Sequence, residues 1–284
     1  PVWLGTDAHI TRFSEPAPLF YERSAWGDAP TRSRIETLSA LMPPDEHQHS
    51  GTQPIVVTSA RALMTRTLPV HRFRESVMIL RVKTRASIDK LIERWVRLGY
   101  ESAGMVIEPG QFSRRGGILD IFPLANDRPI RIEFYGDEID SLRTFDPSSQ
   151  RTIGIISEVI IPPAREALPG ESQKAIGQLA TWFASLAGKD GADMTSAAAD
   201  QIPLTTGSAF PFLEFYLPYL YPHPVSLLDY APDDALIVVE DGGELRDTIT
   251  EIEMASAKAR DERITSGQLP ADFPKPFLTW EEIA

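Results

Sequence analysis

The clearest hydrophobic pattern in the chain lies between Ser87 and Gly99. Apolar side chains recur there at every third or fourth position, which is the spacing of one helix face. The Ser87 hydroxyl can cap the first turn of such a helix, and Gly99 can take the left-handed conformation that commonly ends one. The pattern predicts a helix whose buried face carries Ile88, Leu91, Ile92, Trp95 and Leu98.

Short apolar and alternating runs surround this helix and predict strands. Turn-forming sequences such as Pro109-Gly110 and Gly136-Asp137 separate several of them. Because most of these connections are too short for a parallel crossover, the strands are expected to pair antiparallel. The predicted strands are Val77–Val82, Ala103–Glu108, Gly117–Phe122, Ile130–Tyr135, Ile139–Phe145 and Ile153–Ile161. Residues 77–163 are therefore expected to form an α+β domain with an antiparallel sheet.

The flanking regions alternate predicted helices with predicted strands, as α/β proteins do. Before the sheet come a helix at 31–42, a strand at 54–58 and a helix capped by Ser59. After it come a helix from Gly170 to Leu186, an irregular connector at 188–207, a buried strand at Ala235–Val239 and a helix from Glu244 to Ile264. We expect one discontinuous α/β domain, formed by residues 1–76 and 164–284, into which the domain at 77–163 is inserted.

Charge is distributed unevenly along the chain. The net charge is −12, from 28 basic and 40 acidic residues, yet residues 77–163 hold 12 of each and are neutral. A surface that binds DNA unaided normally carries a basic stripe, so neither segment fits that class of protein. The absence of cysteine excludes disulfides and thiolate zinc sites and fits a reducing cytosol, so we expect a cytoplasmic protein. The neighbours His47 and His49 lie in a polar, proline-bounded loop, which favours a solvated loop over a metal site.

The predicted strand Ile130–Tyr135 alternates between two faces. The isoleucines and Phe134 share one face, whereas Arg131, Glu133 and Tyr135 share the other. Antiparallel pairing of the preceding hairpin is expected to bring Arg115 close to Tyr135. Exposed arginine and tyrosine are typical of protein interfaces, although an ordinary solvated strand can also expose such a row. The pattern alone leaves both interpretations open.

No nucleotide-binding loop is found. The only Gly-Lys pair, Gly188-Lys189, has Phe183 where the first glycine of a phosphate loop should stand and Asp190 where the hydroxyl residue should stand. The acids Glu240 and Asp241 follow the predicted strand at Ala235–Val239, a place where magnesium ligands can occur. Without a phosphate loop we interpret them as a strand cap or a relic, so this chain is predicted to have no catalytic site and no cofactor of its own.

Several motifs resemble one known family. They run from Pro109 to Pro123 (PGQFSRRGGILDIFP), from Arg131 to Arg143 (RIEFYGDEIDSLR), and through Phe145-Asp146 and Ser149-Gln150-Arg151. These motifs, with further similarity at Phe20–Ser24, 54–69 and 227–239, closely resemble the UvrB-homology module of the bacterial transcription-repair coupling factors. The resemblance covers nearly the whole chain.

The resemblance implies a function in nucleotide excision repair. It implies that the domain at 77–163 binds UvrA, with Arg115, Arg131 and Tyr135 as the contacting residues. Phenylalanine is frequent in the family at the position of Tyr135, so the tyrosine is a departure that keeps the ring. The flanking domain is implied to be a degenerate RecA-like, helicase-type domain that has lost ATP binding.

The resemblance also carries expectations about the longer protein of which this chain, starting at Pro1, reads as a piece. In the family a distant C-terminal domain covers the UvrA-binding face. The ATP- and magnesium-dependent motor, and the contacts with RNA polymerase and duplex DNA, are expected beyond Ala284. Two alternatives to an adaptor stay open: an ATP-dependent translocase or helicase domain acting on its own, and a UvrB-like repair subunit that binds damaged DNA.

Overall fold

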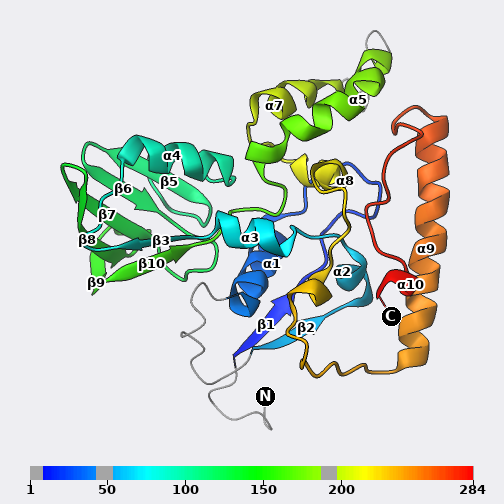
Figure 1. The fold of residues 1–284 in the computed structure, drawn as a ribbon, viewed down its shortest axis with the longest axis horizontal. Helices are drawn as coiled ribbons and strands as arrows, with labels where there is room; N and C mark the ends of the chain where they lie inside the picture. The colour runs from blue at the N-terminus through cyan, green and yellow to red at the C-terminus, as the bar shows by residue number, and fades with distance from the viewer. Residues whose placement is uncertain (1–8, 43–53, 187–196, 284) are drawn as a thin grey trace.

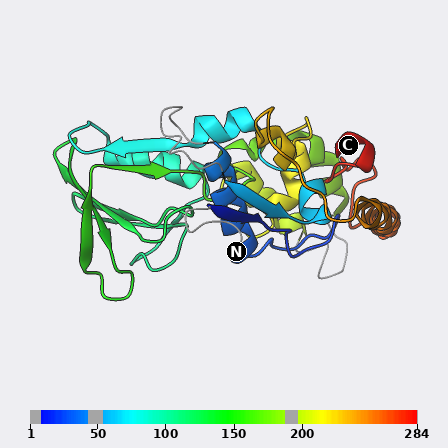
Figure 2. The same cartoon turned by 90° about the horizontal axis from the view of Figure 1, so that it is seen from below.

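A computed structural model describes residues 9–42, 54–186 and 197–283 of the chain. The fold is mixed α/β. A six-stranded sheet lies at one end of the elongated molecule and the long helix α9 (Gly242–Thr265) lies at the other, as both views show (Figures 1 and 2). Between them lie short helices and a small parallel sheet.

The six-stranded sheet has the strand order β4-β5-β6-β7-β8-β9, so its neighbours in space are neighbours in sequence. All its pairs are antiparallel except β4–β5. The predicted antiparallel sheet is thus confirmed in its main part. The strands are β4 (Glu101–Ser102), β5 (Gln111–Arg115), β6 (Ile118–Ile121), β7 (Ile130–Tyr135), β8 (Glu138–Phe145) and β9 (Thr152–Ile156).

Helix α4 (Ile88–Arg97) lies along one face of this sheet (Figure 1). The predicted cap is present, because the Ser87 hydroxyl accepts a hydrogen bond from the backbone N–H of Lys90. Trp95 is fully buried and its ring lies 5.7 Å from that of Phe112 on β5. This packing fixes which face of the sheet is the core, and it leaves the opposite face to the polar row described below.

The strand predicted at Ala103–Glu108 does not form. Only Glu101–Ser102 pairs, in parallel with the start of β5, and the chain then leaves the sheet plane. Val106 is buried with Phe122 and Phe145 in a small second core. The backbone N–H groups of the two residues after it donate to the side chain of Gln111 instead of to a strand. Packing of a single valine therefore overrides the strand pattern, and β5 is a strand that the prediction missed.

The strand predicted at Ile153–Ile161 divides at Ser157 between two sheets. Its first half, β9, closes the six-stranded sheet, and its second half, β10 (Glu158–Ile161), pairs antiparallel with β3 (Met78–Arg81). The predicted strand at Val77–Val82 is confirmed as β3, but it lies outside the main sheet.

The region before the main sheet contains a parallel pair of strands, β1 (Ile10–Phe13) and β2 (Ile55–Thr58). The predicted helix near 31–42 is α1 (Asp28–Leu41), and Ser59 caps the short helix α2 (Ala60–Met64) as predicted. Pro69 begins a further helix, α3 (Val70–Ser76), which the sequence pattern did not indicate. The parallel pair agrees with α/β architecture, whereas the RecA-like ancestry of this region stays a prediction.

The region after the main sheet is mostly helical. The predicted helix α5 (Gln173–Leu186) is confirmed. The connector predicted at 188–207 contains the helix α7 (Gln201–Thr206), which ends at the left-handed Gly207. The remaining elements are the 3-10 helices η2 (Pro169–Glu171), η3 (Leu213–Tyr216) and η4 (Leu227–Tyr230), and the helices α8 (Leu217–Leu220), α9 and α10 (Trp280–Ile283).

The prediction of a buried strand at Ala235–Val239 is wrong. This segment has no regular structure and is exposed, with Leu236 at 88%. No strand among the described residues pairs with this segment, and its apolar side chains are not buried against them. Asp241, predicted to be a strand cap or a relic, is instead the N-cap of the helix α9, where it accepts a hydrogen bond from the backbone N–H of Glu244.

A buried ion pair connects segments on either side of the main sheet in sequence. Arg34 of α1 donates to Glu166 at 2.5 and 3.1 Å, and both side chains are almost completely buried. Thr67 donates to the same carboxylate, and the Arg34 guanidinium lies 3.9 Å from the ring centre of Phe13. Residues on both sides of the sheet also contribute to one buried apolar cluster, whereas the discontinuous domain and its boundaries at 76 and 163 stay predictions.

Candidate protein-docking site

Asp120 of β6 holds two arginines on the sheet face opposite α4. Arg131 donates through Nε and Nη2 at 2.8 and 2.9 Å, one bond to each carboxylate oxygen, and Arg115 donates through Nη2 at 2.6 Å. The Asp120 side chain is only 1% exposed. A carboxylate this buried is stable only when it is paired, and the bidentate geometry is the strong form of such a pair.

The strand register explains why these groups meet. Asp120 is directly opposite Arg131 on β7 and directly opposite Ser113 on β5, and Arg131 is in turn opposite Arg143 on β8. Residues that face one another across a ladder share a face of the sheet. The four side chains therefore form one row across four strands, which we call the arginine row.

Arg131 is the more enclosed of the two arginines. Its side chain is 17% exposed, against 52% for Arg115, and its guanidinium lies 4.7 Å from the ring centre of Phe145. The hydrogen bonds from Arg131 to Asp120 raise the pKa of Arg131, so this group stays cationic. Arg131 is thus a rigidly held cation whose exposed edge lies in a fixed place.

The turn between β8 and β9 supports Arg131 from the side. The amide oxygen of Gln150 lies 3.5 Å from Arg131 Nη2, while the amide nitrogen donates to the carbonyls of Val106 and Pro147. Gln150 has a left-handed backbone with φ of 59°, an unusual conformation for a residue other than glycine. Asp146 stabilises the turn by accepting hydrogen bonds from both backbone N–H groups of Ser148 and Ser149.

Arg115 was predicted to lie close to Tyr135, but the strand register does not place the two side by side. Arg115 is opposite Ile118, which is opposite Glu133, so Arg115 aligns with Glu133 and its guanidinium turns to Asp120. Arg115 therefore groups with Arg131 instead of with Tyr135. The prediction was displaced by two positions because the hairpin register could not be derived from the sequence.

Tyr135 lies at the end of β7 and is 83% exposed. The predicted alternation along β7 agrees with the burial of its side chains, because Ile130 and Ile132 are buried and Arg131 and Glu133 are partly exposed. Glu133 is held by Ser141 at 2.6 Å and by Arg143 at 3.1 Å. Its charge is thereby matched within the sheet.

Sequence reasoning missed Asp120 and Gln150. Asp120 stands alone among apolar residues in Ile-Leu-Asp-Ile-Phe, and an isolated acid in a strand that is otherwise buried signals a partner of opposite charge. Gln150 carried no signal of this kind, because its role depends on a turn conformation that its residue type does not favour.

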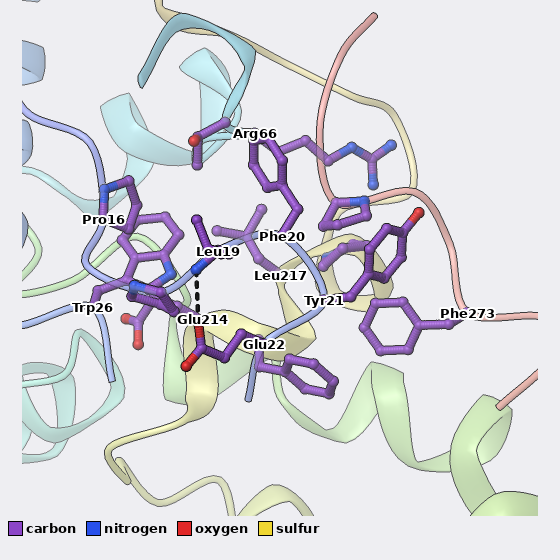
Figure 3. A pocket seen from close by; sticks show the side chains of 15 residues that line it. Pro16, Leu19, Phe20, Tyr21, Glu22, Trp26, Arg66, Glu214, Leu217 and Phe273 are labelled. Carbon is purple, nitrogen blue, oxygen red and sulfur yellow. Dashed lines mark hydrogen bonds between the residues drawn. The ribbon is translucent and has the colours of Figure 1, made fainter. Parts of the chain in front are cut away.

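A small pocket lies away from this row, between the segment 16–26 and η3 (Figure 3). Its walls are mainly proline and aromatic side chains such as Phe20, Tyr21 and Phe273, and its volume is about 50 Å³. Sites for nucleotides and other drug-sized ligands are several-fold larger. This pocket can hold a few water molecules and does not alter the view that the arginine row is the main candidate site.

The structure adds little on metals and phosphate loops. Among the described residues no group of three or more His, Asp or Glu side chains is arranged to hold a metal ion. The loop with His47 and His49, and the Gly188-Lys189 pair, lie outside the described residues. In the described part of the chain no helix is both long enough and apolar enough to span a membrane.

The region that contains the arginine row matches a known family. Residues 78–166 match the family model described as the UvrB interaction domain. The transcription-repair-coupling factor of Bacillus subtilis is 32% identical over 243 residues, which are 83% of this chain and 21% of that protein. The transcription-repair-coupling factor of Haemophilus influenzae is 29% identical over 246 residues, which are 87% of this chain and 20% of that protein. The one of Myxococcus xanthus is 42% identical over 134 residues, which are 47% of this chain and 11% of that protein.

The chain spans about a fifth or less of the length of these relatives. The resemblance to the transcription-repair coupling factors found in the sequence is thus confirmed. The chain is a homologue of the transcription-repair coupling factors over about four-fifths of its length, and it contains a region that matches the UvrB interaction domain.

Proposed function

We propose that this chain is a non-catalytic adaptor that recruits UvrA to a stalled RNA polymerase. The observation that carries the proposal is the pair of arginines held by Asp120 on the sheet face opposite α4, with Tyr135 exposed on the same strand as Arg131. Rigid arginine and tyrosine side chains are the residues most often found at the energetic centre of protein interfaces. Arg115, Arg131 and Tyr135 are the proposed contacts.

Electrostatics favours a protein partner over DNA at this face. The arginine row carries Asp120 among its cations, and Glu133 lies next to it on β7. A nucleic-acid surface needs several unopposed cations to release counterions from phosphates. A partner that offers one or two well-placed carboxylates requires only the exposed edges of Arg115 and Arg131.

The test is binding of purified UvrA by the wild-type chain and by the double variant Arg115→Ala/Arg131→Ala. Loss of central arginine anchors typically costs about 2 kcal/mol or more, which is roughly thirtyfold in affinity. Arg246→Ala is the matched control, because Arg246 is exposed on α9 at the other end of the molecule. Undiminished binding by the double variant, with an unchanged circular dichroism spectrum, would contradict the proposal.

An ATP-dependent activity of the chain itself is the competing function. Its discriminating measurement is ATP hydrolysis by this chain, with and without duplex DNA. Turnover that is lost on changing Glu240 and Asp241 would favour a motor. Asp241 is the N-cap of α9, and its carboxylate already accepts a hydrogen bond from a backbone N–H. This capping argues against a part for Asp241 in a motor.

A further inference from the structure

The main sheet ends in an edge strand with exposed apolar side chains. On β9, Ile155 is 80% exposed and Ile153 is 49% exposed. Strand β9 is last in the strand order, so no other strand of the described residues pairs with its outer side. Edge strands are usually protected by charged residues or proline at their exposed positions. An isoleucine this exposed contributes almost no burial to the stability of the chain alone.

Ile155 continues the arginine row. It lies directly opposite Arg143 on β8, which is opposite Arg131 on β7. Since directly opposed residues share a face, Ile155 and Arg131 lie on the same face of the sheet, two strands apart. With Ile155 included, the row begins at Ser113 on β5, passes through the buried carboxylate of Asp120 and two arginines, and ends at an exposed apolar side chain.

The charges of this face indicate the chemistry of what covers it. Arg115, Arg131 and Arg143 are cations, and Asp120 and Glu133 are the anions that they contact. One positive charge is left in excess among these five groups. A partner surface complementary to the face would hold carboxylates over the arginines and an apolar side chain or recess over Ile155.

We propose that the UvrA-docking surface extends from Arg131 through Arg143 to Ile155, and that the UvrA surface covering it is acidic with an apolar contact for Ile155. This rests on the proposed function, and it adds Arg143 and Ile155 to the contacts. Burying an isoleucine beside anchored arginines gives the interface an apolar centre surrounded by directional polar contacts, the arrangement that produces high affinity.

The test compares Ile155→Ala and Ile155→Asp with wild type in the affinity of the full chain for purified UvrA. Ile202 supplies the matched control Ile202→Asp, because it is an isoleucine on α7 that is 71% exposed and far along the chain from the sheet. We expect Ile155→Asp to weaken binding at least about tenfold and Ile155→Ala less, while Ile202→Asp stays within about twofold. Thermal unfolding of all three variants should match wild type, since both positions are exposed.

The outcomes separate this inference from the proposed function. If Ile155→Asp binds as wild type while Arg115→Ala/Arg131→Ala loses binding, the extension is wrong and the proposed function stands. If neither variant affects binding, both the extension and the proposed function are wrong. The last measurement is the sedimentation mass of the chain without UvrA. If the wild type is a dimer and Ile155→Asp is a monomer, the edge strand binds a second copy of the chain and the extension is wrong.

Discussion

Arg131 and Asp120 form a bidentate ion pair across neighbouring strands, at 2.8 and 2.9 Å, with the carboxylate buried. The pair also receives Arg115, so one carboxylate sets the separation of two guanidinium groups. In this arrangement Asp120 is a positioning residue. It does not reach the exposed surface itself, and its effect on a partner passes through the arginines.

Replacing Asp120 by alanine is expected to lower the free energy of unfolding by about 2 kcal/mol, because Arg131 loses both acceptors in a mostly buried place. Equilibrium unfolding in urea measures the change. Asp127→Ala is the control, because Asp127 is fully exposed and makes only a long contact of 3.8 Å with Arg32. This variant should change the free energy of unfolding by less than about 0.5 kcal/mol. Equal effects of the two variants would show that Asp120 does not anchor the pair.

Replacing Tyr135 is expected to affect binding and leave stability unchanged. The ring is almost fully exposed, so Tyr135→Ala should change the free energy of unfolding by less than about 0.5 kcal/mol. Loss of the ring should weaken UvrA binding about tenfold, whereas Tyr135→Phe should bind within about threefold of wild type.

Both affinities can be measured by titration calorimetry. Met254→Ala on α9 removes an exposed apolar side chain elsewhere and serves as the control. If Tyr135→Phe loses as much affinity as Tyr135→Ala, the hydroxyl and not the ring makes the contact, and the expectation that the ring is what matters is wrong.

Local patterns predicted the elements whose partners lie on the same short segment. The helix α4 was predicted from its apolar spacing and from the caps at Ser87 and Gly99, all within thirteen residues. Strand β7 was predicted from its alternation and is observed at the predicted residues. In both cases the information that determines the element is local, so one sequence suffices.

The elements that failed depend on distant partners. Val106 leaves the sheet because Phe122 and Phe145 offer it a second core, which no pattern within 103–108 indicates. The candidate site was predicted on the strand that forms β7, yet the residue that pairs with its arginines, Asp120, was not identified. Its recognition required the register between β6 and β7, and the sequence does not specify that register to a single residue.

The Arg34–Glu166 pair provides a test of the shared core. Changing Glu166 to glutamine, or Arg34 to methionine, leaves the other charge buried with incomplete pairing and should lower the free energy of unfolding by about 3–5 kcal/mol. The double variant Arg34→Met/Glu166→Leu removes both charges and should regain a large part of that loss. A double-mutant cycle in urea built from Arg34→Met and Glu166→Leu measures the coupling.

The coupling is expected to exceed about 1 kcal/mol, since the two groups share hydrogen bonds in a buried site. Additive single effects would show that the two side chains act independently. Arg72 and Glu75, an exposed pair at 3.0 Å, supply the control cycle, whose coupling should lie near or below about 0.5 kcal/mol.

The exposed segment Leu236–Val239 is expected to make the chain self-associate. Four consecutive aliphatic residues there are exposed and unpaired within the described residues, and such β-prone runs are sites of intermolecular strand pairing. The variant Ile237→Lys/Val238→Lys should lower the weight-average mass measured by sedimentation at high protein concentration, without changing the unfolding midpoint. The control Ile202→Lys/Met254→Lys adds the same two charges at two separate exposed positions. If both double variants reduce association equally, net charge is the cause and the segment has no specific part in it.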